Sequence, residues 1–169
     1  TRKLSPLHLM ERGSSLSGTA HSLIAGVRAD VAKRELATFA DAFNWGEDRR
    51  KIQQISPEQG PGNVFHVSLE HEHVTEVFTG FGDRGVSAET VAWRVVSDVR
   101  EYLVSTAAVG QHLADQLLLP MALAGSSSFS TTKISPHLFS NAEVIQKVLT
   151  VEIVSKKING SYCEVSISS

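Results

Sequence analysis

Three hydrogen-bonding side chains fall on one face of an otherwise apolar segment. In the run His-Leu-Ala-Asp-Gln-Leu-Leu-Leu-Pro at 112–120, His112, Asp115 and Gln116 are spaced i, i+3 and i+4, as neighbours on a helix surface are. The remaining positions are rich in leucine and suit burial. Burying the polar groups unpaired would cost about 1–3 kcal/mol each. The spacing therefore predicts that a ligand or another part of the protein meets this face, and the pattern alone favours neither.

A histidine follows a proline in the segment Ser135 to Asn141. Pro136 stiffens the backbone before His137, and Ser140 or Asn141 can cap a following helix. By spacing alone, the simpler interpretation of His137 is a loop histidine that makes a turn hydrogen bond. The alternative is a positioned imidazole that is mostly neutral near pH 7 and therefore nucleophilic.

The run Gly80 to Gly85 matches G-x-G-x-x-G between an expected strand and an expected helix, as phosphate-binding loops do. Three features argue against a dinucleotide site. The strand at 74–79 alternates polar and apolar side chains, unlike a buried parallel strand. No acidic residue ends a following strand, and the next element is another helix. We therefore interpret Gly80 to Gly85 as a glycine-rich loop.

His71 and His73 lie on one side of an extended segment, as a pair of metal ligands would. Two ligands are fewer than the three or four of a zinc site, and strand parity puts His66 on the opposite face. We expect a solvated hairpin turn at 71–73 and no metal site. Cys163, the only cysteine, has no obvious base beside it and is expected to be an unreactive strand residue.

The composition limits the function classes that fit the chain. Its 169 residues carry 16 Lys and Arg against 18 Asp and Glu, which excludes a strongly basic nucleic-acid module but not a local basic groove. Arg49 to Lys51, with Arg28, Lys33 and Arg34 near in sequence, is either a solvated face or a modest RNA-contacting patch. The 41% hydrophobic content argues against disorder.

The sequence shows no membrane span and no export signal. Its longest apolar stretch, Leu117 to Ala124, is broken by Pro120 and is far shorter than the roughly 20 residues that a span needs. One cysteine suits a reducing compartment, so we expect a cytoplasmic protein. The chain begins at Thr1 without an initiator methionine, and we expect it to come from a longer or processed protein.

The elements that must position these residues follow an α+β pattern with mixed sheets. Ser87 can cap a helix whose Val91, Val95 and Val99 share one stripe. Asn159-Gly160 suits the turn of a final hairpin. Helices are expected at 31–43, from 87 onward, at 109–123 and at 141–149, and strands at 4–10, 19–27, 52–55, 64–70, 74–79, 129–134, 151–155 and 162–167.

The order of several motifs resembles the RNA 3′-terminal phosphate cyclase family. The motifs are Glu11 to Gly13, Gln59 to Asn63, Arg84 to Glu89, His112 to Gly125 and Ser135 to Asn141. The most specific part is Leu-Ala-Asp-Gln-Leu at 113–117 with Pro-Met-Ala-Leu-Ala at 120–124. The resemblance runs from Leu4 to Ile167 but covers only the C-terminal half of a family member.

The resemblance implies a fold. Members of the family have a large domain of repeated βαβαββ units and a small inserted α+β domain. Residues 1–12 would then be a strand of the large catalytic domain. Residues 13–104 would form the inserted domain of four strands and two helices, and residues 105–169 would complete the last repeat.

The resemblance also implies chemistry. The family uses ATP to convert an RNA 3′-terminal phosphate to a 2′,3′-cyclic phosphate. The position matching its nucleophile is His137, which would attack the α-phosphorus of ATP and form a histidine–AMP intermediate. AMP would then pass to the RNA 3′-phosphate, and the neighbouring 2′-hydroxyl would attack and expel it.

The nucleotide contacts of the family map onto His112, Leu113, Ala114, Asp115 and Gln116. A divalent cation, magnesium, is implied for the triphosphate, and no cage for it is evident in this sequence. The missing N-terminal half would be needed, as the same chain or as a partner, so we expect the chain alone to be inactive. The alternative is a non-catalytic RNA-binding or ribosome-assembly member. That branch lacks the nucleophilic histidine, so His137 favours the catalytic one.

Overall fold

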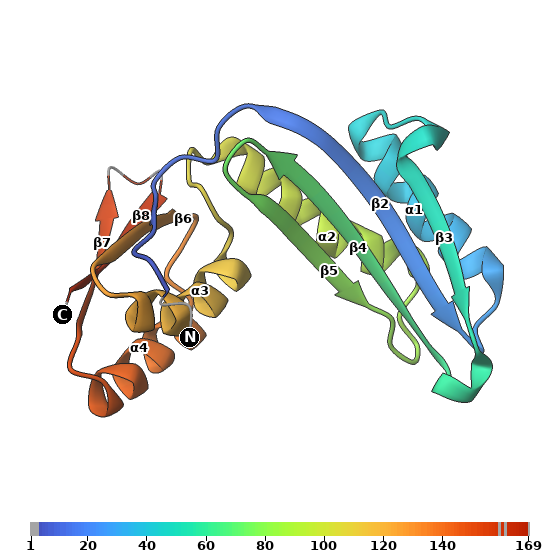
Figure 1. The fold of residues 1–169 in the computed structure, drawn as a ribbon. Helices are drawn as coiled ribbons and strands as arrows, with labels where there is room; N and C mark the ends of the chain where they lie inside the picture. The colour runs from blue at the N-terminus through green and yellow to red at the C-terminus, as the bar shows by residue number, and fades with distance from the viewer. Residues whose placement is uncertain (1–3, 159, 161, 169) are drawn as a thin grey trace. The chain divides into compact units, whose positions relative to one another are not determined.

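The computed structural model of the protein describes residues 4–158, 160 and 162–168 and has an α+β fold (Figure 1). The described residues divide into two compact units. Unit 1 comprises Thr1–Ser14, His71–Glu76 and Glu101–Ser169, and unit 2 comprises Ser15–Glu70 and Val77–Arg100. Each unit contains a mixed four-stranded sheet. The predicted fold class is therefore confirmed, whereas the assignment of 1–12, 13–104 and 105–169 to domains of the family stays a prediction.

The sheet of unit 1 has the strand order β1-β6-β8-β7. β1 pairs in parallel with β6, whereas β6 with β8 and β7 with β8 are antiparallel. The first pair joins segments about 120 residues apart in sequence. The strands are β1 (His8–Leu9), β6 (Ser127–Thr131), β7 (Glu152–Ile158) and β8 (Tyr162–Ser168).

Two helices, α3 (Gln111–Ala124) and α4 (Pro136–Val148), pack on this sheet. Leu118 of α3 and Leu138 of α4 are buried in one hydrophobic cluster with Phe129 of β6 and Val165 of β8. Such a cluster excludes water from one side of each helix, so the two helices are held by their apolar faces. Their polar faces remain free for other contacts.

The sheet of unit 2 has the order β3-β2-β4-β5, with β2 and β3 parallel. Helices α1 and α2 lie on one side of it (Figure 1). The ring of Phe39 on α1 packs 5.8 Å from that of Phe65 on β4, and Gly80 of β5 lies against Val91 and Val95 of α2. The elements are β2 (Ser15–Ala25), α1 (Ala29–Phe43), β3 (Arg50–Ile55), β4 (Gly62–His71), β5 (Thr75–Phe81) and α2 (Ala88–Val104), with short 3-10 helices at Glu47–Arg49 and Pro57–Gln59.

The first strand of unit 2 begins earlier than predicted. The strand was predicted at 19–27, after a stretch rich in serine and glycine, but β2 begins at Ser15. Gly18 is buried, and a Cβ there would lie 2.7 Å from the ring of Trp45. A small residue is therefore required by close packing, not by a turn. At the far end of the sheet, β5 continues through Gly80 and Phe81.

The start of α4 was also predicted wrongly. The helix begins at Pro136 instead of Asn141, and its cap is Ser135 instead of Ser140 or Asn141. Proline is well tolerated at a first helical position because the N–H that it lacks has no partner there. α3 begins at Gln111, since Val109 bonds to Ser130 of β6 instead. Of the expected final turn, Asn159 lies outside the described residues.

No helix within the described part of the chain has both the length and the apolar character needed to cross a membrane.

Candidate active site on α3 and α4

The polar face predicted at 112–116 lies on the first turns of α3. Ala114 and Leu118 are buried, so the helix is fixed with His112 and Gln116 exposed and Asp115 half-buried. The Ala114 side chain and much of Leu113 belong to the core. Any contact of Ala114 with a ligand would therefore involve the backbone, whereas Leu113 is half-buried and its N–H lies in the first turn, where no intrahelical acceptor exists.

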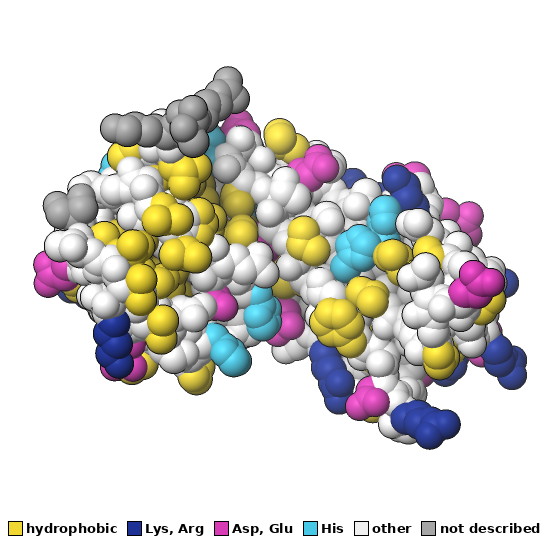
Figure 2. Space-filling model, turned by 60° about the horizontal axis from the view of Figure 1, so that its bottom comes forward, with side chains coloured by type: hydrophobic (Ala, Val, Ile, Leu, Met, Phe, Trp, Pro, Cys, Tyr) yellow, Lys and Arg dark blue, Asp and Glu magenta, His cyan; other side chains and the backbone are white. Residues whose placement is uncertain are grey.

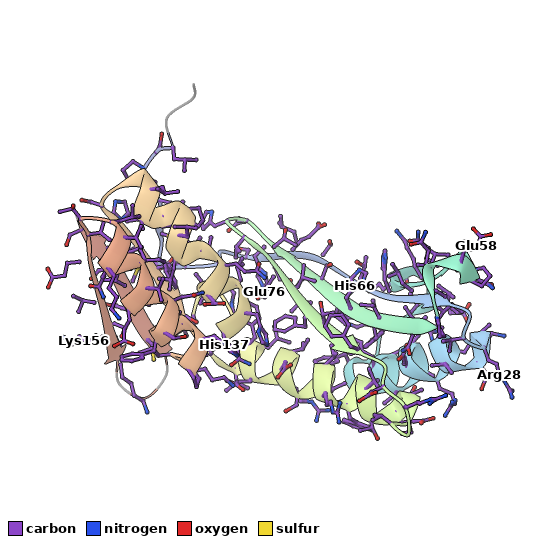
Figure 3. The ribbon with its side chains drawn as sticks, turned by 90° about the horizontal axis from the view of Figure 1, so that it is seen from below. Arg28, Glu58, His66, Glu76, His137 and Lys156 are labelled. Atoms are coloured by element: carbon purple, nitrogen blue, oxygen red, sulfur yellow. The ribbon has the colours of Figure 1, made fainter. Side chains whose placement is uncertain are left out.

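His137 is the second residue of α4 and is exposed (Figure 3). The Ser135 hydroxyl accepts a hydrogen bond from the Leu138 N–H at 3.1 Å, and Leu138 is anchored in the core. The imidazole is therefore carried by a capped helix start and not by a loop. The N-terminus of a helix favours anionic groups such as phosphates. An exposed imidazole at this place can act as a nucleophile toward such a group.

A hydrogen bond joins the two helices on their exposed sides. Asn141 Nδ2 donates to Asp115 Oδ1 at 2.7 Å. Asn141 is one turn after His137 and on the same face of α4. The structure thus brings Asp115, on the polar face of α3, next to the face of α4 that carries His137. Sequence reasoning had considered Asn141 only as a helix cap.

A buried carboxyl group fixes the start of α3. Glu76 is 1% exposed, and its Oε2 accepts a hydrogen bond from the N–H of Gly110, the N-cap residue, at 2.8 Å (Figure 3). Burial raises the pKa of Glu76 to about 7, and the hydrogen bond from Gly110 opposes that rise. Sequence reasoning missed this residue. The sequence contained one indication of its burial. Glu76 and Phe78 are two residues apart on a strand, so their side chains point to the same, buried side.

Arg12 is a second residue whose contacts the sequence did not predict. Its guanidinium lies 4.4 Å from the centroid of the Tyr102 ring and donates to the carbonyl oxygens of Tyr102, Leu103 and Ser105. The carbonyls at the end of a helix lack intrahelical donors. Arg12 therefore satisfies the C-terminal end of α2.

The turn predicted at 71–73 is confirmed for Glu72 and His73, which lie between β4 and β5, but His71 belongs to β4 and is not solvated. His71 is buried with its ring 5.9 Å from that of Tyr102, because it continues the buried row of β4. Glu72 and His73 are exposed, and hydrogen bonds from Ser14 hold the pKa of Glu72 below its ordinary value. Among the residues that the structure describes, no group of three His, Cys, Asp or Glu side chains could hold a metal ion.

Gly80 and Gly82 serve close packing within unit 2, whereas Gly85 has open space around its Cβ position and a φ of +78°. Gly82 N–H donates to the Asn63 carbonyl at 3.0 Å, and a Cβ at Gly82 would lie 1.8 Å from Asn63 Oδ1. Gly80 faces α2 in the same way. Cys163 is buried in β8, as expected of a strand residue.

The fold and the site define an α+β protein in which an imidazole at a helix start lies beside a polar helix face. A family model described as RNA 3′-terminal phosphate cyclase matches residues 3–154. The chain is 49% identical over 151 residues to the RNA 3′-terminal phosphate cyclase of Ralstonia nicotianae, which is 89% of this chain and 43% of that protein.

Proteins of the same name are similar in two further organisms. The identity is 47% over 156 residues in Ectopseudomonas mendocina, covering 92% of this chain and 46% of the relative. In Pseudomonas aeruginosa it is 40% over 164 residues, covering 97% and 48%. The chain therefore belongs to the RNA 3′-terminal phosphate cyclase family, as the resemblance predicted. It spans less than half the length of each of these curated relatives.

Proposed function

We propose that this chain is part of an ATP-dependent enzyme that converts an RNA 3′-terminal phosphate to a 2′,3′-cyclic phosphate. Family membership supports the reaction class. The observation that carries the proposal in this chain is the exposed His137 at the start of α4, one turn before the hydrogen bond between Asn141 and Asp115. We further propose that the enzyme works in the cytoplasm.

In the first step, a ring nitrogen of His137 attacks the α-phosphorus of ATP. A P–N bond forms, the bond to the bridging oxygen breaks, and pyrophosphate leaves with that electron pair. The imidazole then loses the proton of its other nitrogen to solvent or a base. Covalent catalysis of this kind replaces one difficult dehydration by successive easier transfers.

In the second step, an oxygen of the RNA 3′-phosphate attacks the same phosphorus, and the P–N bond breaks. The imidazole recovers its electron pair, and its other nitrogen takes back a proton from solvent or a base, which regenerates neutral His137. In the third step, the neighbouring 2′-oxygen attacks the activated 3′-phosphorus and loses its proton, while AMP leaves. The terminal phosphate is then cyclic and His137 is free for another turnover.

The polar face of α3 would bind the nucleotide in this scheme. His112 and Gln116 are exposed and can contact the base or ribose, while Asn141 orients Asp115. Ala114 would contribute only backbone, since its side chain is buried in the core, while Leu113 is half-buried.

A divalent cation, magnesium, belongs to the proposal as counter-ion of the triphosphate. The described residues contain no cluster of side chains suited to hold it. Ligands for it would come from the nucleotide, from water and from the part of the family's chain that this sequence does not span.

Labelling with α-32P-ATP tests the role of His137. The complete protein should take up label in an acid-labile bond, as expected of a phosphoramidate, and His137→Ala should take up none. The matched control is His8→Ala, because His8 is another exposed histidine of unit 1. It should be labelled like the wild-type protein.

Equal labelling of His137→Ala would contradict the assignment. A search by mass spectrometry for a histidine peptide carrying AMP gives an independent readout. RNA binding without any such peptide would indicate the non-catalytic RNA-binding or ribosome-assembly alternative.

A further inference from the structure

One face of the unit 2 sheet carries no helix. α1 and α2 pack on the side to which Phe65, Val67 and Leu69 of β4 point. The alternate residues of β4 therefore point to the other side, where His66 is half-buried. Figure 2 shows histidine side chains together on one face of this unit, among hydrophobic and uncharged groups. We call this side of the sheet the open face.

Two imidazoles and a lysine lie together on the open face. The ring centroids of His21 on β2 and His66 on β4 are 5.0 Å apart, and the rings are tilted by 43°. Lys51 of β3 is the register partner of His21, so the two side chains share a face. Three neighbouring strands thus each contribute one group that carries or can accept positive charge (Figure 3 labels His66).

Burial and neighbouring positive charge both disfavour the protonated form of the two imidazoles. Burial and then the charge of Lys51 lower the pKa of His21, and burial and then His21 lower the pKa of His66. Glu70 is an acidic side chain of β4 on this face. It lies near the C-terminal end of the strand, four residues after His66, and accepts a hydrogen bond from the Ser17 hydroxyl at 2.7 Å. The exposed residues of β5 on this face, which are Thr75, Val77, Thr79 and Phe81, are uncharged. An anion bound here would be attracted to Lys51 and would favour protonation of the two imidazoles.

The same face offers flat apolar surface. Phe81 is 67% exposed and Val77 is 45% exposed at the edge strand β5. Aromatic and imidazole rings on an open four-stranded sheet can stack unpaired bases, while nearby cations contact the phosphates. A single-stranded RNA supplies both bases and phosphates, whereas the bases of a duplex are stacked and paired.

We propose that the open face, through His21, Lys51, His66 and Phe81, binds single-stranded RNA upstream of the reacting 3′ end. The choice of RNA as the polyanion rests on the proposed function. The location of the binding site is inferred from the positions and charges of side chains in unit 2.

Fluorescence anisotropy of a labelled single-stranded RNA with a 3′-hydroxyl, without ATP, tests the proposal. Phe81→Ala and His66→Ala should each weaken binding at least about fivefold, since stacking of one base contributes that much or more. Lys51→Ala should weaken binding and reduce the dependence of affinity on salt by about one released ion.

Matched controls come from the helix-covered side of the same unit. Trp93 and Arg94 on α2 are exposed there. Arg94→Ala and Trp93→Ala should bind RNA like the wild-type protein. The proposal is overturned if the open-face variants bind normally, or if these two controls lose as much affinity as they do. It is also overturned if a duplex binds more tightly than the single strand.

Binding should tighten from pH 8 to pH 6, because bound phosphate favours the imidazolium form of His21 and His66. The double variant His21→Ala/His66→Ala should lose this dependence on pH. Circular dichroism and the midpoint of thermal unfolding identify any variant that fails to fold. Persistence of the full pH dependence in a folded double variant would refute the role of the imidazoles.

The outcome is distinguishable from failure of the proposed function. Labelling by α-32P-ATP depends on His137 in unit 1, so the open-face variants should keep it. If the open-face variants are labelled normally and their RNA affinity is unchanged, only the proposal that the open face binds RNA is refuted. Absence of labelling in a wild-type protein of full family length, with RNA binding lost in the open-face variants, would refute the enzymatic proposal alone.

Discussion

The carboxyl group of Glu76 is the residue whose chemistry most depends on its surroundings. Because burial raises its pKa from 4.5 to about 7, the folded state binds its proton more tightly than the unfolded chain does. The stability that this proton contributes is fully present below about pH 4.5 and is lost as the pH rises to about 7. The difference corresponds to about 3 kcal/mol in the free energy of unfolding.

Glu76→Gln should remove this part of the pH dependence. The amide cannot titrate, but its oxygen can still accept the hydrogen bond from Gly110. Urea unfolding at pH 5 and pH 8 should therefore show a smaller difference in the variant, which becomes the more stable protein at pH 8. The buried Glu35, whose pKa is also raised by burial, keeps its own contribution in both proteins.

The control for this experiment is Glu143→Gln, an exposed position on α4. It should retain the difference in stability of the wild-type protein between pH 5 and pH 8. If Glu76→Gln has the same pH dependence as this control, the buried carboxyl group does not titrate in that range.

Contacts between neighbours in sequence were predicted better than contacts between distant residues. Ser87 was predicted to cap a helix, and its hydroxyl accepts the Thr90 N–H at 3.1 Å. That prediction succeeded because a cap depends on neighbours in sequence. The bonds of Asn141 to Asp115 and of Glu76 to Gly110 span 26 and 34 residues, and no local pattern determines which distant partner a polar side chain meets.

At the scale of elements, the start of α4 determines how His137 is presented. Ser135→Ala removes the cap and should lower the free energy of unfolding by about 1 kcal/mol. Ser135→Thr should retain most of it. Ser140→Ala is the discriminating control, because Ser140 was the predicted cap but only donates to the His137 carbonyl in the structure. A larger loss for Ser140→Ala in urea unfolding would restore the predicted helix start.

Elements with strong periodicity were predicted well. The stripe of Val91, Val95 and Val99 predicted α2, and apolar spacing predicted α1 to within two residues at its start. The beginning of β2 was missed because serine and glycine are typical of loops. Its strand conformation depends on packing of Gly18 under Trp45, which is a contact made only in the folded unit.

At the scale of the whole molecule, the two units divide the proposed tasks. Unit 1 contains His137 and the polar face of α3, and unit 2 contains the open face. The pairing of β1 with β6 across 120 residues could not be predicted from two short segments. The protein family, in contrast, was recognisable from the order of the motifs, because a family resemblance draws on the whole chain.

We expect the 169-residue chain alone to take up no label from α-32P-ATP. The curated relatives are more than twice as long, and the proposed triphosphate site needs ligands beyond those described here. A protein of full family length carrying the same residues should be labelled at His137. Labelling of the short chain at the same rate would show that α3 and α4 suffice.

The six residues His71–Glu76 have a practical consequence for dissecting the protein. They sit between the two sequence blocks of unit 2 yet belong to unit 1, where Glu76 bonds to Gly110. Excising 13–104 as a single cassette would discard that carboxylate and leave the first turn of α3 unsupported. A shortened protein meant to keep unit 1 intact should therefore retain these six residues, joined to the rest of unit 1 by short linkers.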